Sequence, residues 1–532
     1  MRGIPCRPAG RPAAHIFGLH RRACPPMAQT FRRLLRCASF KNFIPPRHVM
    51  SIARAASAGF WSAIDVLARQ GVQFVTSVIL ARLLAPSDFG IIALASFFSS
   101  LAQVLLQGGL TTALVQRQDT SHEEESAAFW INLIVSVVLS LALLAAAPAI
   151  AVFYQHPILA PLMWAAVAQI MLTALGAVHA ALLARRLAFV ALAKVGVVSA
   201  LLSGATGLLA AYLGEGVWAL AWQGMVATAS YSAGLWIVGD WTPKLRFRFA
   251  DIRRLFGFGA WLSVASILDV VYTQGFSLLV GKLHGVRELG LYNRASSTQL
   301  LPSTVLSLII SRVALPLFVP RVDDQDATRR GMRMAISFAM LLNVPIMVGL
   351  VLLPDMVIGV LFGAQWLPAA PILRILAISG LFYPLHVINL HVLLAQGRSR
   401  SFLHIEIAKK AVGIMLVVFG SIFGIYGLAW AQVMASIVSL ALNAGVTQRS
   451  LNYGPIEQLI DLRGIFACSA VMAAYIYVIT ALIALPPLFM LSILVPSAAA
   501  VFFVCGFSFR MSSFVEAAGV VSVLIKGSRK VG

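Results

Sequence analysis

Long apolar stretches recur along this chain at short intervals, and they limit its possible folds more than any other feature. They run from Phe60 to Phe509, and each is about as long as a membrane-crossing helix, which needs roughly 20 apolar residues. Only 11% of the 532 residues are Asp, Glu, Lys or Arg, against about 25% in a typical soluble domain. So few charges could not cover a soluble protein, whereas lipid covers a membrane protein. The sequence therefore predicts an all-α polytopic membrane protein.

The apolar stretches divide into about fourteen predicted transmembrane helices. They are 60–81, 89–110, 128–153, 158–183, 190–212, 216–239, 256–281, 289–316, 333–353, 367–396, 403–423, 425–447, 464–484 and 487–509. The tenth contains Pro371 and Pro384, which predict a kink, and a short interfacial segment around Phe362–Pro368 is expected before it. An even number of spans places both ends of the chain on one side.

Basic residues are distributed unequally between the two sides that these spans define. With the N-terminus inside, twenty Lys and Arg fall in the inner loops and tail, and only Arg82, Lys282 and Arg287 fall in the outer loops. Cytoplasmic loops carry such an excess of Lys and Arg. We therefore expect a bacterial inner-membrane protein with both termini in the cytoplasm. The net charge of +22 fits contact with anionic lipid headgroups, and no nucleic-acid partner is expected.

Residues 1–49 differ from the rest of the chain. They contain ten Lys or Arg and no acidic residue, and no apolar run in them is long enough for a span or a signal sequence. We expect translation to begin at Met50, with 1–49 a non-native upstream stretch; a disordered basic tail and a transit peptide are the alternatives. The five cysteines form no CxxC pair and no cluster with histidines, so no metal site and no cofactor are expected.

Two segments about 200 residues apart share a pattern of charges and glycines. SVILARLLAPSDFGIIALAS begins at Ser77, and SLLVGKLHGVRELGLYNRAS begins at Ser277. At this constant offset the matched pairs include Arg82 and Lys282, Asp88 and Glu288, and Gly90 and Gly290. A second pair, GVWALAW at 216–222 and GIYGLAW at 424–430, recurs at an offset of 208. We therefore predict two six-helix lobes, 50–248 and 249–450, related by a parallel repeat around a central cavity, with two additional helices and a cytoplasmic tail in 451–532.

Several motifs add a family resemblance. LARLLAPSDFG, ALVQRQD followed by FWINL, GLYNRA, and QWLPAAPILRIL together resemble polysaccharide exporters of the Wzx type, near the colanic-acid and exopolysaccharide branch of the multidrug/oligosaccharidyl-lipid/polysaccharide flippase superfamily. The resemblance runs from about Ser57 to Asn452. It implies a flippase that moves an undecaprenyl-pyrophosphate-linked oligosaccharide repeat unit to the outer leaflet by alternating access, for exopolysaccharide, O-antigen or capsule assembly. A polysaccharide polymerase and a chain-length regulator are then expected partners.

Charged residues inside the predicted spans are the candidate site residues, because a charge at mid-bilayer costs at least about 2.5–3.5 kcal/mol. Asp65 and Arg69 lie four residues apart on the first span, and the repeat aligns Arg69 with Asp269. We hypothesise that Arg69 binds the pyrophosphate in the cavity, because a guanidinium offers planar, bidentate donors and stays charged. Asp65 and Asp269 would be its switching or coupling partners. A structural Asp65–Arg69 ion pair is the alternative.

Two more arginines and several amides are candidates for contact with the substrate. Arg294, in GLYNRA, and Arg374, in PILRIL, could reach the cavity or could instead snorkel or serve the structure. Six amides at membrane depth could touch sugar hydroxyls or join helices: Gln73, Gln103, Gln107, Gln274, Asn293 and Gln299. No catalytic residue is expected, because no loop is long enough to fold as a domain.

Three other functions remain open. A cation-coupled multidrug antiporter of the same superfamily would share the fold, with Asp65 as its ion site, but cavity arginines favour an anionic substrate. A membrane-embedded polymerase or ligase of sugar repeat units would carry a large periplasmic loop, whereas the outer loops here are short. A lipid II flippase would share both the fold and a cationic cavity, and only the family motifs disfavour it.

Overall fold

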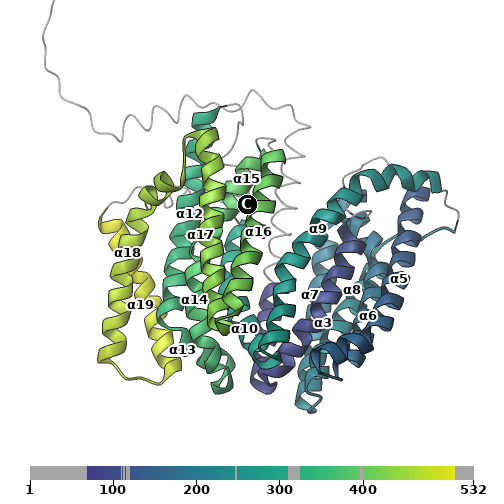
Figure 1. Cartoon of the computed structure of the whole chain (residues 1–532), viewed down its shortest axis with the longest axis horizontal. Coiled ribbons are helices and arrows are strands. Elements are labelled where there is room, and N and C mark those ends of the chain that lie inside the picture. Colours follow the sequence, from purple (N-terminus) through teal and green to yellow (C-terminus); the bar gives the residue numbers. More distant parts are fainter. Residues whose placement is uncertain are drawn as a thin grey trace, which may run out of the picture. The chain divides into compact units, whose positions relative to one another are not determined.

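The computed structural model describes residues 69–108, 111, 114–115, 120–245, 249–309, 324–395, 399–509 and 514, all within the unit Ala58–Gly532. These ranges contain helices and no strand, which confirms the predicted all-α class (Figure 1). After a helix over residues 69–83 come α3 (Pro86–Gly108), α5 (His122–Tyr154), α6 (Leu159–Arg185), α7 (Phe189–Tyr212), α8 (Val217–Val238), α9 (Phe249–Leu283), α10 (Val286–Ile309), α12 (Gln325–Leu352), α13 (Pro354–Phe362), the 3₁₀ helix η3 (Ala364–Ala369), α14 (Ala370–Gly380), α15 (Tyr383–Ala395), α16 (Ser399–Ser421), α17 (Gly424–Leu451), α18 (Pro455–Leu482) and α19 (Pro487–Ser508).

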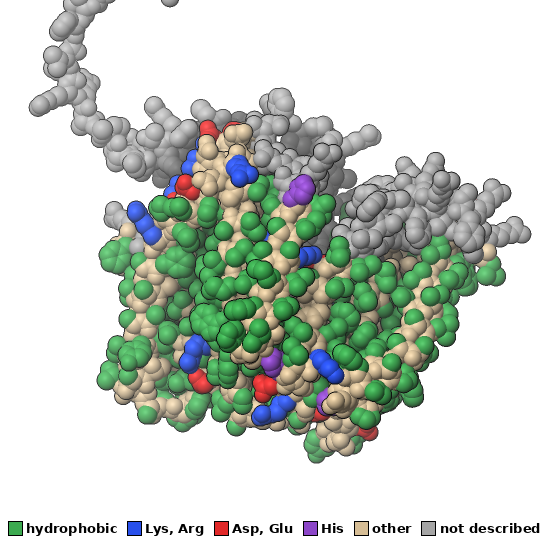
Figure 2. All heavy atoms as spheres, viewed as in Figure 1, with side chains coloured by type: hydrophobic (Ala, Val, Ile, Leu, Met, Phe, Trp, Pro, Cys, Tyr) green, Lys and Arg blue, Asp and Glu red, His purple; other side chains and the backbone are tan. Residues whose placement is uncertain are grey.

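The helices have the lengths and the apolar faces of membrane spans. Nine stretches in the described part of the chain are long and apolar enough to cross a bilayer. Large apolar side chains cover their outward faces; on α5, for example, Val138 and Leu141 are 60% and 61% exposed. Figure 2 shows a mostly hydrophobic band between helix ends where most charged side chains gather. The chain is therefore a multi-pass membrane protein, and the count of fourteen spans stays a prediction.

Helix ends follow local sequence signals. The N-cap of α5 is Ser121, whose hydroxyl accepts a hydrogen bond from the Glu124 amide (3.1 Å), while the Glu124 carboxylate accepts one from the Ser121 amide (3.0 Å). The predicted tenth span is interrupted: α14 ends at Gly380 and α15 begins at Tyr383, just before Pro384. The short η3 occupies the position of the expected interfacial segment.

The helices pack as two sets that correspond to the two copies of the repeat. In the first half, α6 packs against α3, α5 and α8, and α7 packs against α8. In the second half, α14 packs against α10, α12 and α17, and α16 packs against α17. The last two helices add to the second half, where α18 packs against α12 and α19 packs against α13 (Figure 1).

Contacts between the halves involve α3, α5, α9 and α10. The first turns of α3 and α10 lie against each other, and α9 packs along both α3 and α5. An apolar cluster that includes Ala81, Leu291, Phe362 and Trp366, all nearly inaccessible, closes the same end of the junction. The halves are thus joined firmly where the first helix of each half ends.

Candidate functional site

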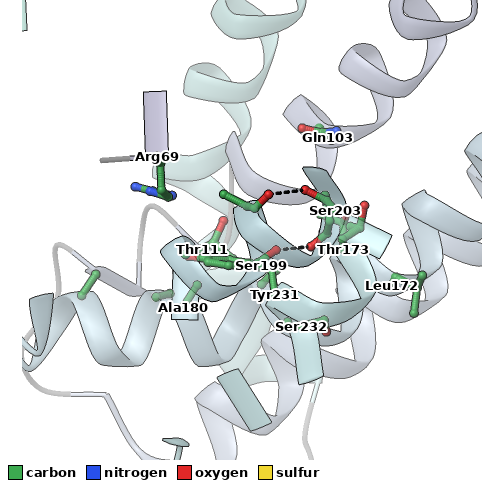
Figure 3. A pocket seen from close by; sticks show the side chains of 18 of the residues that line it. Arg69, Gln103, Thr111, Leu172, Thr173, Ala180, Ser199, Ser203, Tyr231 and Ser232 are labelled. Carbon is green, nitrogen blue, oxygen red and sulfur yellow. Dashed lines mark hydrogen bonds between the residues drawn. The ribbon is translucent and has the colours of Figure 1, made fainter. Parts of the chain in front are cut away.

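A cavity of about 720 Å³ with polar and apolar lining residues lies inside the first half, among the helix over 69–83, α3, α6, α7 and α8 (Figure 3). All twenty of its lining residues belong to this half. The sequence placed the cavity between the two lobes, and the structure places this one within a single lobe. The reason is the small side chains that α6 and α7 turn toward it, which leave space between helices that are otherwise packed.

Arg69 is the one charged side chain among the residues that line this cavity. It lies at the start of the described part of the first helix and faces α7, where Gly196 leaves room for it. A Cβ at position 196 would lie 2.6 Å from Arg69 Cδ and 3.0 Å from Arg69 Nε, so any larger residue there would displace the guanidinium. The position of Arg69 therefore depends on glycine at 196. The sequence analysis placed Arg69 at the central cavity between the lobes, whereas here Arg69 lines a cavity inside the first half. Its role in binding stays a prediction.

Hydroxyl groups form most of the remaining polar lining. Ser199 donates to the Ala227 carbonyl (2.6 Å), Thr173 to the Gln169 carbonyl (2.8 Å) and Thr228 to the Gly224 carbonyl (2.6 Å). Each of these hydroxyl oxygens keeps lone pairs that can accept a further hydrogen bond. The cavity wall therefore offers acceptors for the hydroxyl groups of a ligand, next to one fixed cation.

Two amide side chains complete the polar lining. Gln73 follows Arg69 by one helical turn, and Gln103 lies on α3; both are exposed toward the cavity. Their amides make no hydrogen bond to another described side chain or backbone group, so both donors and acceptors are available to a ligand. Sugar hydroxyls and phosphate oxygens are the groups that such a lining recognises.

The lining residues lie from the middle of the helices toward one common end. On α6 and α8 they run from the middle of the helix toward its C-terminal end, and on α7 they run from Gly196 to Ser203, before and around its middle. This end leads to the connections between α3 and α5, between α6 and α7, and between α8 and α9, which belong to the basic set predicted to be cytoplasmic. The contacts between the halves described above lie at the opposite end. The cavity is thus at the end of the molecule with the basic loops.

Arg294 lies away from this cavity, at the junction of the halves. Its guanidinium donates to the Ser77 hydroxyl (2.7 Å) and its Cζ stands 4.4 Å, 4.8 Å and 5.2 Å from the ring centres of Phe89, Phe362 and Trp366. The residue is only 8% exposed. These partners come from both halves, so Arg294 joins the halves and does not line the cavity described here.

The other predicted site residues are also apart from Arg69. Arg374 on α14 forms an exposed ion pair with Asp355 (3.1 Å), and Asp269 on α9 pairs with Lys410 on α16 (3.1 Å). The described structure thus gives Asp269 a cationic partner other than Arg69. Asp65 lies outside the described residues.

Several lining residues were not singled out from the sequence. They are mainly the small and hydroxylated residues of α7, α6 and α8, such as Ser199, Ser203 and Thr228. One signal was present: Gly196, Ser199 and Ser203 recur at helical spacing along one face of α7. A stripe of this kind also marks close helix packing, so by itself it does not identify a cavity.

Comparisons with known proteins bear on the family and the fold of the chain. The family described as polysaccharide biosynthesis protein matches residues 79–371. The teichuronic acid biosynthesis protein TuaB of Bacillus subtilis is 26% identical over 394 residues, which cover 73% of this chain and 80% of TuaB. The lipopolysaccharide biosynthesis protein WzxC of Escherichia coli is 26% identical over 399 residues, with the same coverage of 73% and 80%. A solved structure of the lipid II flippase MurJ in an inward closed conformation has 16% identity, a TM-score of 0.69, and coverage of 84% of this chain and 98% of that one, which shows a shared fold.

Proposed function

Because the chain belongs to the polysaccharide biosynthesis protein family, we propose that it flips an undecaprenyl-pyrophosphate-linked oligosaccharide repeat unit from the cytoplasmic to the outer leaflet by alternating access. Its relatives TuaB and WzxC are named for the biosynthesis of teichuronic acid and of lipopolysaccharide. The product would serve exopolysaccharide, O-antigen or capsule assembly. The chain transports and does not catalyse a reaction.

The observation that carries this proposal is the composition of the cavity. Its lining combines Arg69 with hydroxyls and free amides, and no carboxylate is among the twenty lining residues. A guanidinium in a site of low dielectric strongly favours an anionic group such as pyrophosphate, and hydroxyls and amides suit the adjoining sugar. A cation-coupled multidrug antiporter is the weaker candidate, because a cationic drug would be repelled by Arg69.

The size of the cavity limits which part of the substrate it holds. A volume of about 720 Å³ lies within the roughly 300–1,000 Å³ typical of sites for small molecules. We assign it to the pyrophosphate and the sugar attached to it. The remaining sugars and the polyprenyl chain then lie outside the cavity, so recognition depends on the reducing end of the repeat unit.

The proposed orientation follows from the distribution of basic loops. The cavity lies at the end with these loops, which the positive-inside rule places in the cytoplasm. The halves are joined at the opposite end, which is then the outer face of a bacterial inner membrane. Both termini would be cytoplasmic, and a polymerase and a chain-length regulator would take the product at the outer face. Residues 1–49 are proposed to be an extension before a start at Met50.

The test is a deletion of this gene in cells that keep the initiating sugar transferase. We expect complete undecaprenyl-pyrophosphate-linked repeat units to accumulate in the cytoplasmic leaflet, and expression of the chain from Met50 to clear them. Unchanged lipid-linked pools together with an altered tolerance to cationic drugs would contradict the proposal and favour the antiporter.

A further inference from the structure

The first helix of each half ends in a basic side chain that reaches a helix terminus of the other half. Arg82 donates from Nε to the Leu361 carbonyl (3.0 Å) and from Nη2 to the Val360 carbonyl, at the end of α13. Lys282, at the end of α9, donates to the Phe153 carbonyl at the end of α5 and lies 4.2 Å from the ring centre of Phe153. The last carbonyls of a helix have no partner within it and carry partial negative charge, so a cation is well suited to them.

The internal repeat relates these two contacts to each other. Arg82 and Lys282 are 200 residues apart, and Phe153 and Leu361 are 208 residues apart. These are the two offsets found between the copies of the repeat. Equivalent donors in the two halves therefore contact equivalent acceptors in the opposite halves.

Each contact is reciprocated. The Trp366 indole donates to the Ala81 carbonyl (2.6 Å), and the Gln365 amide donates to the same carbonyl (2.8 Å), at the end of the first helix. On the other side, the Tyr154 hydroxyl donates to the Leu278 carbonyl near the end of α9 (3.4 Å). Each pair of helix ends thus exchanges hydrogen bonds in both directions.

A glycine crossing lies between the two exchanges. A Cβ on Gly90 would clash with the Val286 carbonyl oxygen, and a Cβ on Gly290 would clash with the Pro86 carbonyl oxygen. The same Cβ positions lie only 3.1 Å from the Gly290 nitrogen and 3.2 Å from the Gly90 nitrogen. The backbones of α3 and α10 therefore touch at equivalent glycines, and the two exchanges flank this contact.

We propose that the two exchanges are a pair of equivalent latches, which together hold the halves closed at the face opposite the cavity. Hydrogen bonds to helix ends suit this purpose, because water can replace them at a small net cost when the halves separate. This inference rests on the proposed alternating-access function, in which both latches open when the cavity turns to the outer face. Because the latches are equivalent, loss of either one is expected to have a similar effect.

The test measures how often this face opens. Ala81 is completely buried beneath Trp366, so a cysteine placed there reports on opening through its reaction with a water-soluble maleimide. The reporter Ala81→Cys is made in a full-length chain in which the five native cysteines are replaced by alanine, and the protein is studied in lipid nanodiscs. No substrate is needed.

We expect Arg82→Ala and Lys282→Ala each to raise the labelling rate about tenfold, which corresponds to ~1.4 kcal/mol, and the double variant about a hundredfold. Arg287→Ala is the matched control, because Arg287 is an exposed basic residue at the same face that makes no contact with a described residue through its charge; its rate should match that of the reporter alone. If an alanine variant does not fold, the labelling rates of Arg82→Gln and Lys282→Gln are compared with that of the control instead.

Labelling of the Arg82 and Lys282 variants at the rate of the Arg287 control would overturn the latch proposal. A large effect of one variant and none of the other would overturn the equivalence of the two latches. Because labelling needs no cargo, these results do not depend on which substrate the protein carries, and the leaflet measurement in deleted cells decides that question separately.

Discussion

The two halves of this transporter are alike at one end and different at the other. Where they meet, Arg82 and Lys282 make equivalent contacts, and Gly90 and Gly290 cross at equivalent positions. Within the membrane the halves differ. The first contains a cavity with Arg69, whereas the equivalent residue of the second is an acid, Asp269, in an ion pair.

In the second half, paired charges lie at and near the position that corresponds to Arg69. Lys409 pairs with Glu406 on α16, Lys410 pairs with Asp269, and Tyr272 packs against Gly413. The comparison teaches that the repeat keeps its symmetry where the halves must close on each other. It loses that symmetry around the first-half cavity, where we propose that an asymmetric ligand binds. Four sets of substitutions test this division between a symmetric closed end and an asymmetric interior.

The largest effect is expected from Arg69→Ala. Removing a charge that pairs with the ligand in a desolvated site costs about 2–5 kcal/mol, so transport should fall by roughly 30-fold to several thousand-fold. The measurement is export of repeat units per inserted protein. Lys194→Ala is the control, since Lys194 is an exposed cation on α7 that does not line the cavity. Equal export by both variants would contradict the proposal that Arg69 binds the ligand in the first-half cavity.

A smaller loss of transport, similar in size for the two variants, is expected from Gly90→Ala and Gly290→Ala. Each added methyl group clashes with a backbone carbonyl of the other half, and forced overpacking typically costs about 1–3 kcal/mol. Transport should fall by similar factors in the two variants. Gly71→Ala is the control, because no atom lies within 4 Å of a Cβ there. Loss in only one of the two variants would break the symmetry of the closed end.

Arg294→Met should affect stability more than transport. The change removes the hydrogen bond to Ser77 and the contact of the cation with three aromatic rings, which together contribute about 2 kcal/mol. Thermal unfolding of the detergent-solubilised protein should begin at a lower temperature, while export per folded molecule stays near that of the native chain. Normal stability with abolished export would instead place Arg294 in the substrate pathway.

The smallest effect concerns the ion pair between Asp269 and Lys410. Because the Asp269 side chain is 61% exposed, either single change should cost no more than about 1 kcal/mol, and transport should fall less than about tenfold. Exchanging the two residues should restore the rate. Exchanging Arg69 with Asp269 should not, since the described structure pairs Asp269 with Lys410. Rescue by the second exchange would show that the halves interact across the cavity after all.

The fold could be predicted from the sequence because its signals are local. About twenty apolar residues in a row specify a membrane helix, and the break before Pro384 follows from the missing proline amide. The repeat in the sequence showed that Arg82 and Lys282 occupy equivalent positions, as do Gly90 and Gly290. It could not show that these residues contact the opposite half, because the acceptors Leu361 and Phe153 carry no distinctive side chain.

The site was harder to predict because it depends on which neighbours cover each charge. Arg69 and Arg294 look alike in the sequence, as arginines within apolar stretches. Gly196 leaves Arg69 beside a cavity, whereas Phe362 and Trp366, 68 and 72 residues further along the chain, cover Arg294. Such long-range packing is not contained in composition, periodicity or short motifs.

The central claim is that the first-half cavity recognises the pyrophosphate of a lipid-linked sugar through Arg69. The most direct test is translocation of an undecaprenyl-pyrophosphate oligosaccharide in vesicles that contain the purified chain, measured as the fraction of lipid accessible to an enzyme added outside. The account predicts rapid exchange between the leaflets with the native chain, exchange at least about 30-fold slower with Arg69→Ala, and native exchange with Lys194→Ala. Exchange by Arg69→Ala at the native rate would contradict it.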